Sequence, residues 1–153
     1  MPEFLELTVD KFTFKVATDR LYSPEGMWAK EESAQGAKQV RVGLSDFFQQ
    51  RNGDVAFAEI TEEGSELEVD DEIAVIETIK VDISLPSPLA GEIVEVNPAM
   101  EMEPEKINFD PYGDGWLAVV DPRNWEATSA DLLTPEAYYD RVKVEAEEEV
   151  RKG

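Results

Sequence analysis

The sequence predicts a mainly β domain, a sandwich of two packed sheets with short helices and one helix at the C-terminal end. Short apolar runs with strand patterning recur through the middle of the chain, and Gly, Pro and Asn separate them at regular intervals. Helical patterning begins only near residue 125, so the alternation of strands and helices that a parallel sheet needs is missing. The chain has 153 residues, a length typical of one domain.

The expected strands lie between these turn signals. Phe12, Phe14 and Val16 alternate with polar residues, which predicts a half-buried strand, whereas the preceding segment 4–7 could either pack or fray. Further strands are expected at 27–29, 39–44, 55–60, 73–79, 83–85, 92–96 and 115–120. The predicted core includes Val42, Leu44, Phe47, Val55, Phe57, Ile73, Val75, Ile93, Val94, Val96, Trp116, Leu117 and Val119.

Two helices carry recognisable end signals. Ser45 and Asp46 can accept hydrogen bonds from the free amides of a short helix over 47–51, which Gly53 would end. Thr134 and Pro135 are typical of an N-cap followed by a first helical residue, and they predict a final helix to about residue 150.

The composition excludes several classes of function. Asp and Glu total 35 against 14 Lys and Arg, a net charge of −21 that disfavours nucleic acid and anionic membranes and favours partners with basic docking faces. The absence of Cys and His excludes disulfides, thiol nucleophiles, Ser-His-Asp triads and Cys- or His-ligated metals. The start lacks signal-peptide features and no run is long enough to span a bilayer, so a soluble cytoplasmic protein without catalytic or metal-ligating residues is expected.

Lys80 is the residue that we single out for chemistry. It is expected in the turn between strands 73–79 and 83–85, in an apolar stretch with Glu77 and Asp82 on either side. An exposed turn lysine is the ordinary interpretation. A lysine at a hairpin tip is also well presented to a modifying enzyme, because its four-carbon stem extends the amine away from the backbone.

From about Arg20 to Val142 the chain resembles the H-protein of the glycine cleavage system, a lipoyl-carrying relative of the lipoyl/biotinyl hammerhead domains. The matching segments, specific in their order and spacing, are 42–49, 53–57, 76–80, 87–97, 107–116 and, in the closing helix, 132–133 with 137–138. The resemblance implies a hammerhead-type sandwich and places Lys80 on the lipoylated lysine. It divides the chain into an N-terminal extension or strand (1–19), a lipoyl domain (20–142) and a charged helix end (143–153).

The resemblance also implies a non-catalytic carrier with covalently bound lipoic acid as a swinging arm. Its expected partners are a lipoate ligase or lipoyl transferase, dihydrolipoamide dehydrogenase and client enzymes. We expect Glu77 and Asp82 to help the ligase recognise the turn. Ile79 and Val81 stand where biotin acceptors usually carry methionine, which favours lipoate. The acids at 62, 63, 66, 68, 70–72 and 77 are expected around the face that bears the arm, where they could steer the protein to basic clients.

Two residues depart from the family pattern. Met27 replaces a glutamate, and Ser84 an aspartate, that would hold the amine of an aminomethyl-loaded arm. An ammonium group in a cleft needs counter-charges. Asp82 is near Ser84 in the sequence, but alternation along a strand leaves open whether it takes the place of the missing aspartate. The departures favour a related branch, the lipoate-binding proteins of heterodisulfide-reductase-like sulfur oxidation, over the alternative of glycine cleavage. A third alternative is an unmodified protein-interaction module.

Overall fold

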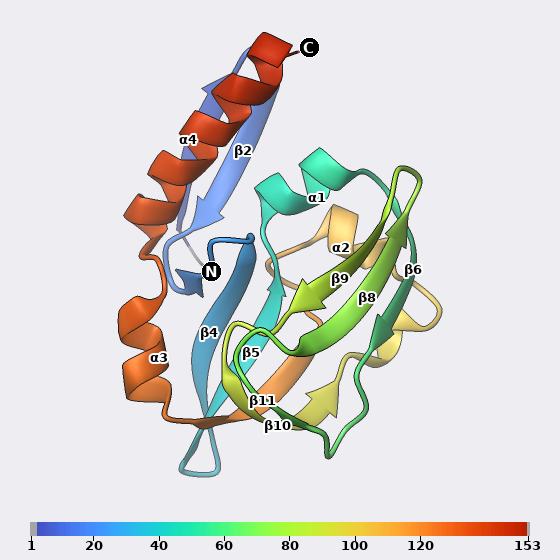
Figure 1. Cartoon of the computed structure of the whole chain (residues 1–153), viewed down its shortest axis with the longest axis vertical. Helices are drawn as coiled ribbons and strands as arrows, with labels where there is room; N and C mark the ends of the chain where they lie inside the picture. The colour runs from blue at the N-terminus through green and yellow to red at the C-terminus, as the bar shows by residue number, and fades with distance from the viewer. Residues whose placement is uncertain (1–2, 153) are drawn as a thin grey trace.

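The computed structural model describes residues 3–152 and shows a β sandwich from which a hairpin and a long helix project at one end (Figure 1). The larger sheet is antiparallel, with the spatial order β3 (Leu21–Tyr22), β4 (Met27–Ala34), β5 (Ala37–Leu44), β11 (Ala118–Arg123), β10 (Ala90–Val96) and β7 (Glu66–Leu67). The smaller antiparallel sheet has the order β6 (Val55–Ile60), β8 (Glu72–Thr78) and β9 (Asp82–Pro86). The predicted mainly β fold with a sandwich of two sheets is confirmed.

The main core lies between these two sheets, where strand alternation points one side of each strand inward. Val40, Val42 and Leu44 of β5 are completely buried, as are Ile93 of β10 in the same sheet and Ile73 of β8 in the facing sheet. Burying a side chain of this size stabilises the fold by roughly 1.5–3 kcal/mol. The predicted core residues that are buried are Val42, Leu44, Phe47, Val55, Ile73, Ile93, Leu117 and Val119.

The prediction was wrong for Phe57, whose side chain is 45% exposed. A β-bulge between Val55 and Phe57 inserts an extra residue into β6, so Ala58 rather than Phe57 faces the core. Trp116 is only half-buried because it precedes β11, which begins at Ala118 instead of residue 115, and the Arg41 guanidinium covers its ring at 4.3 Å. The remaining half-buried predictions are Val75, Val94 and Val96.

The helix ends follow the predicted signals. The Ser45 hydroxyl accepts from the Phe48 amide at 3.1 Å at the start of α1 (Asp46–Asn52), and Gly53 ends this helix at a φ of +88°. Thr134 caps α4 (Pro135–Lys152) through the Ala137 amide at 3.1 Å. The short helical segments η1 (Pro98–Met100) and α2 (Lys106–Phe109) lie between β10 and β11, and α3 (Trp125–Asp131) lies between β11 and α4.

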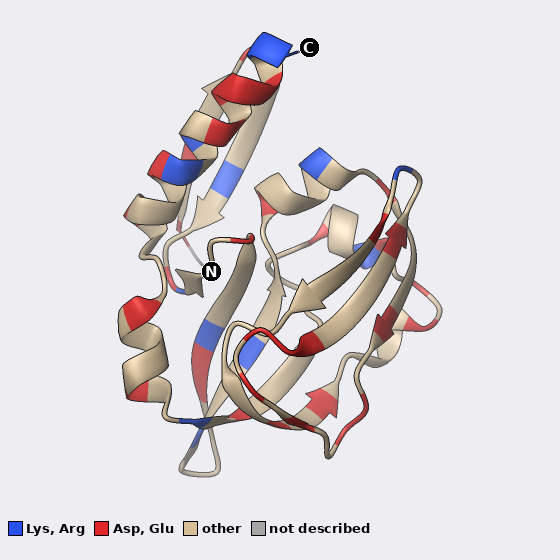
Figure 2. Cartoon of the chain, viewed as in Figure 1, with Lys and Arg blue, Asp and Glu red and all other residues tan. Residues whose placement is uncertain are grey.

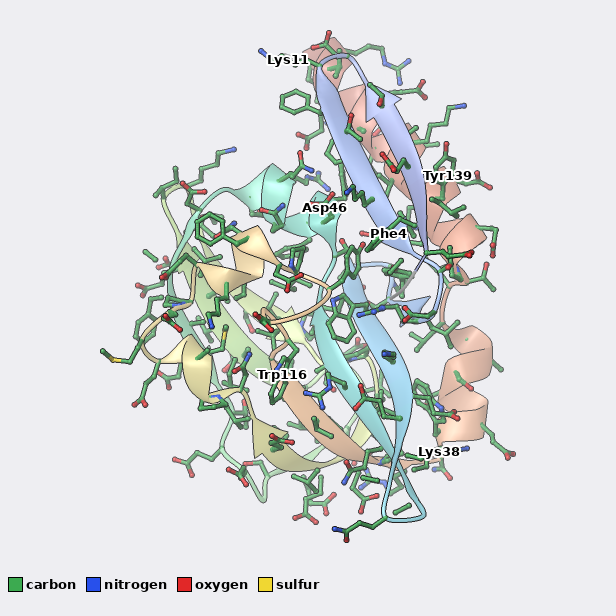
Figure 3. All side chains as sticks on the ribbon, turned by 180° about the vertical axis from the view of Figure 1, so that it is seen from behind. Phe4, Lys11, Lys38, Asp46, Trp116 and Tyr139 are labelled. Carbon is green, nitrogen blue, oxygen red and sulfur yellow. The ribbon has the colours of Figure 1, made fainter. Side chains whose placement is uncertain are left out.

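A separate two-stranded sheet adds the projecting hairpin. The segment that could pack or fray forms β1 (Phe4–Val9), which pairs with β2 (Phe12–Ala17). Together with α4 and α1 the hairpin buries a second apolar cluster that includes Leu7, Phe14 and Val142. Figure 3 shows Asp46 at the start of α1 beside this hairpin, where its carboxylate accepts from the Lys15 amide at 2.9 Å.

The acidic residues do not surround the lysine-bearing turn as expected. Glu72 pairs with Pro86 at the base of the β8–β9 hairpin, and the acidic segment 62–71 passes near this base (Figure 2). Lys80 lies at the opposite end, where Glu77 is the one member of the predicted cluster that is near. The reason is strand length, since seven residues of β8 separate the base from the tip. Among the described residues, no helix is both long and apolar enough to cross a bilayer.

Candidate functional site

Lys80 lies in a four-residue turn, 78–81, that joins β8 to β9 after the last cross-strand pair. The backbone closes the turn through the Thr78 amide, which donates to the Val81 carbonyl at 2.9 Å. The Thr78 hydroxyl also accepts from the amides of Lys80 and Val81 at 3.1 and 3.0 Å, and it donates to the Val81 carbonyl at 3.1 Å. One side chain therefore satisfies the polar backbone on both sides of the lysine.

The turn is fastened to the loop that follows α1. The Ile79 amide donates to the Asp54 carbonyl at 3.1 Å. Asn108 of α2 holds this loop, because its side-chain oxygen accepts from the Val55 amide at 2.8 Å and its nitrogen donates to the Gly53 carbonyl at 3.1 Å. Asn108 was not singled out from the sequence. The signal in the sequence is an asparagine between the apolar residues Ile107 and Phe109, because an amide placed in a partly buried position needs hydrogen-bond partners. The structure shows Asn108 half-buried.

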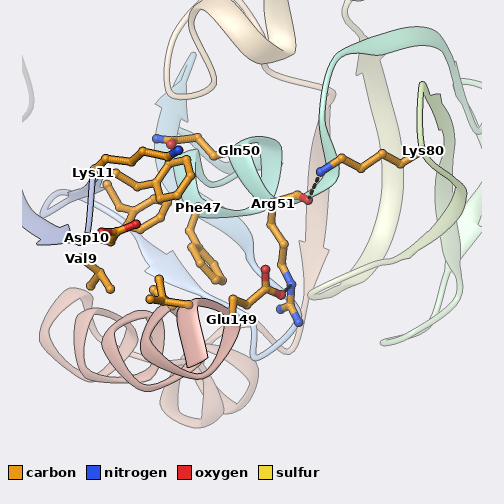
Figure 4. Close-up of a pocket in the computed structure, with 12 residues that line it drawn as sticks. Val9, Asp10, Lys11, Phe47, Gln50, Arg51, Lys80 and Glu149 are labelled. Carbon is orange, nitrogen blue, oxygen red and sulfur yellow. Dashed lines mark hydrogen bonds and ion pairs between the residues drawn. The ribbon is translucent and has the colours of Figure 1, made fainter. Parts of the chain in front are cut away.

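The Lys80 side chain itself is exposed, and its Nζ donates to the Arg51 carbonyl near the end of α1 at 3.3 Å (Figure 4). Within residues 3–152 no carboxylate oxygen lies within 4.0 Å of this Nζ. The flanking Ile79 and Val81 are 74% and 44% exposed. A primary amine between two exposed apolar side chains, on a turn held by several hydrogen bonds, is accessible to an enzyme that acylates it.

The two other predicted site residues lie next to this turn. Glu77 and Asp82 face each other as the last pair of the β8–β9 hairpin, and both side chains are exposed. Strand alternation places Asp82 and Ser84 on the outer side of β9, while Leu85 faces the core. Both acids are therefore positioned where a protein docking on the turn can reach them.

On one side of the turn lies a groove of about 340 Å³, which we call the Glu25 groove. It lies between the 24–26 loop, α1, α4 and the start of β9, and its lining includes Glu25, Phe48, Val81, Ile83, Tyr138 and Glu145. Arg51 pairs with Glu145 at 3.1 Å, whereas Glu25 makes no ion pair with any described residue. Burial raises the pKa of Tyr138, so this hydroxyl beside Ser45 stays neutral at physiological pH.

Neither residue that departs from the family pattern supplies a charge to this groove. Met27 is fully buried in the main core. The Ser84 hydroxyl donates to the Glu72 carboxylate at 2.7 Å on the outer side of the hairpin. Asp82 also stands outside the lining of the Glu25 groove. Of the two carboxylates that line the groove, Glu145 is paired with Arg51, whereas Glu25 is paired with no arginine or lysine of the part of the chain that the structure describes.

The sandwich of two sheets and the lysine at the tip of a fixed hairpin define a domain of the lipoyl/biotinyl hammerhead type. The family model described as Glycine cleavage H-protein matches residues 20–145, and the chain belongs to this family. The crystal structure of a glycine cleavage system H protein from Mycobacterium marinum superposes with a TM-score of 0.71 and 32% identity, covering 81% of this chain and 96% of that one.

Two curated relatives show how far the similarity extends. The glycine cleavage system H protein of Oceanobacillus iheyensis is 38% identical over 120 residues, which is 78% of this chain and 91% of the relative. The protein of the same name from Thermus thermophilus is 38% identical over 131 residues, 86% of this chain and 98% of the relative. The similarity thus spans almost the whole length of both relatives.

Proposed function

We propose that this protein is a lipoyl carrier of the H-protein type, with lipoic acid amide-linked to Lys80. The proposal rests mainly on the geometry of the turn, which presents an exposed amine on a backbone held by Thr78 and Asp54. The residues fit the group, because an acylating enzyme needs an accessible primary amine and, within residues 3–152, no carboxylate pairs with this lysine. Membership of the H-protein family supports the same assignment.

The chain needs no catalytic side chain for this role. A bound lipoyl group supplies redox and group-transfer chemistry through its disulfide and dithiol. The protein's own residues hold the turn and present docking surfaces, a role consistent with a chain that lacks Cys and His. The proposed partners are a lipoate ligase or lipoyl transferase that recognises Glu77 and Asp82, dihydrolipoamide dehydrogenase, and the client enzymes between which the arm moves.

Intact mass spectrometry after co-expression with a lipoate ligase tests the attachment site. Lys80→Arg should abolish the lipoyl mass increment. Lys11→Arg is the matched control, because Lys11 is also exposed at a hairpin tip, between β1 and β2, and its loss should leave the increment intact. An increment that persists in Lys80→Arg disproves the assignment. Wild-type protein that stays unmodified in its native host would instead favour an interaction module.

Glycine cleavage is the client system that the relatives favour, since those named above are glycine cleavage system H proteins. An aminomethyl-loaded arm carries an ammonium, which requires a counter-charge when it is partly desolvated. Glu25 supplies an unpaired carboxylate in a groove that Val81 and Ile83 extend to the lysine turn. We therefore propose that the Glu25 carboxylate is the counter-charge for the ammonium of the aminomethyl-loaded arm.

Heterodisulfide-reductase-like sulfur oxidation is the second candidate client. Met27 and Ser84 favour it, because neither places a carboxylate in the groove and a sulfur-based intermediate would need none. Aminomethyl transfer by purified glycine decarboxylase separates the two. Transfer at the rate of a genuine H-protein, with a loaded state shortened in Glu25→Gln, supports glycine cleavage. An inert lipoylated protein supports the sulfur client.

A further inference from the structure

A second groove opens on the other side of Arg51 and has a volume of about 410 Å³. We call it the hairpin groove, and Figure 4 shows it between the β1–β2 hairpin, α1 and α4, with Lys80 at its edge. Arg51 lines both this groove and the Glu25 groove, so its side chain separates two spaces that each adjoin the lysine turn. The lining of the hairpin groove includes Phe12, Phe14, Phe47, Arg51, Lys80 and Val150.

The walls of the hairpin groove come from both ends of the chain. The hairpin residues 9–14 precede the segment matched by the family model, residues 20–145, and the α4 residues 146–150 follow it. These walls are anchored to α1: the Phe14 ring packs edge-on against Phe47 at 5.1 Å, and Arg51 pairs with Glu149 of α4 at 2.8 Å. The two flanking segments thus converge beside the lysine as one packed structure.

We propose that the hairpin groove is a docking site for the lipoyl group carried on Lys80, an inference that rests on the proposed lipoylation. The occupant follows from the tether, because Lys80 itself lines the groove. Once amide-linked, the lipoyl group is an uncharged hydrocarbon chain that ends in two sulfurs. A lining of phenylalanines and valines suits this chemistry, and the volume lies within the roughly 300–1,000 Å³ of small-molecule pockets.

Exposure supports the same occupant. Phe12 is 44% exposed and Val150 is 42% exposed, so the groove offers apolar surface that an arm can remove from water. The two grooves also differ in charge. Once Lys80 is acylated, the acids Asp10 and Glu149 that line the hairpin groove are balanced by Lys11 and Arg51. The Glu25 groove is lined by Glu25 and Glu145 against Arg51, which leaves one negative charge in excess. An arm without an amine therefore belongs in the hairpin groove, and a cationic arm belongs in the Glu25 groove.

The absence of cysteine makes this docking measurable, because the reduced arm carries the protein's only thiols. Lipoylated full-length protein is reduced with a phosphine, and its alkylation by iodoacetamide is followed by intact mass. The wild-type arm should react about fivefold more slowly than free dihydrolipoamide, a difference equivalent to about 1 kcal/mol. Phe12→Ser and Val150→Ser should each raise the rate at least about threefold, because they remove apolar lining.

Phe109→Ser is the matched control, since Phe109 is 81% exposed on α2 and lies outside the groove lining. It should leave the protection unchanged, and circular dichroism should show every variant folded. Equal rates for the wild type, Phe12→Ser and Val150→Ser overturn the docking inference while the lipoyl mass on Lys80 upholds the proposed function. Protection lost only in Pro24→Ser, at the Glu25 groove, also overturns it. A missing lipoyl mass overturns both.

Discussion

Replacing Thr78 by valine removes the hydroxyl that holds the lysine turn while keeping nearly the same side-chain shape. The wild-type hydroxyl makes three hydrogen bonds, accepting from the Lys80 and Val81 amides and donating to the Val81 carbonyl. The Thr78 backbone amide still donates to the Val81 carbonyl in the variant. The substitution therefore tests the side-chain contribution separately from the backbone closure of the turn.

The three hydrogen bonds of the hydroxyl should stabilise the closed turn by about 1.5 kcal/mol, which Thr78→Val would lose. Each net hydrogen bond contributes roughly 0.5–1.5 kcal/mol, and exposed bonds such as these belong at the lower end of that range. A change of this size alters an equilibrium about tenfold. The open form of the turn should therefore be about tenfold more populated in Thr78→Val, and the free energy of global unfolding should fall by a similar amount, because both transitions break these hydrogen bonds.

Native-state amide hydrogen exchange at Lys80 and Val81 measures this opening directly. Both amides should exchange about tenfold faster in Thr78→Val, and the rate of lipoylation by a ligase should fall with the fraction of formed turn. Thr78→Ser is the matched control, because serine retains the hydroxyl, and it should exchange as the wild type does. If the valine and serine variants exchange at the same rate, the hydroxyl does not hold the turn and our reasoning fails.

Three further predictions follow from contacts in and around the site. Gly43→Ala should lower the free energy of unfolding by about 2 kcal/mol, because its Cβ would lie 2.5 Å from the Trp28 ring; chemical denaturation should show the loss, and Trp28→Phe should relieve it. Asn108→Ala should cost about 1–3 kcal/mol by leaving the Val55 amide without its acceptor, and it should accelerate exchange in the 53–55 loop. Above about pH 10 the free energy of unfolding should fall as unfolded tyrosines ionise first, because burial raises the pKa values of Tyr22, Tyr112 (to about 12) and Tyr138.

Each of these has an outcome that contradicts it. If Gly43→Ala lowers the free energy of unfolding equally in the wild type and in the Trp28→Phe background, the Trp28 ring is not the obstacle. Asn108→Asp retains an acceptor for the Val55 amide and serves as the comparison for the alanine variant. If the amides of the 53–55 loop exchange equally fast in both variants, the Asn108 side-chain oxygen does not hold the loop. For the tyrosines, a raised pKa in the folded state means that the unfolded state releases protons first as the pH rises. A free energy of unfolding that stays constant between about pH 9 and pH 11 would therefore contradict the predicted fall.

The sequence was sufficient where the structure depends on local signals. The caps at Ser45 and Thr134 and the alternation of β5 each follow from a few neighbouring residues. It was misleading at Phe57, because a bulge changes which side of a strand faces inward and alternation alone cannot reveal it. The two-residue strands β3 and β7 were missed because such short segments have no measurable period.

The surroundings of Lys80 were less predictable than the lysine itself. The hairpin groove combines residues near positions 10, 50, 80 and 150, and only tertiary packing brings them together. The acids that follow one another along 62–72 suggested a charged surface around the lysine, but the length of β8 carries them to the far end of the hairpin. The exposure of Glu25 in a groove and the burial of Met27 likewise depend on how the 24–28 segment enters β4.

The contact between Lys80 and the end of α1 has a consequence for the modification itself. A free lysine donates as a cation to the Arg51 carbonyl, and the carbonyl end of a helix favours positive charge. Acylation removes that charge and leaves a single neutral N–H, a weaker donor. The unmodified Lys80 is thus held at the end of α1, and acylation by the proposed lipoyl group would weaken this contact, so that the lysine stem could follow the lipoyl group into either groove.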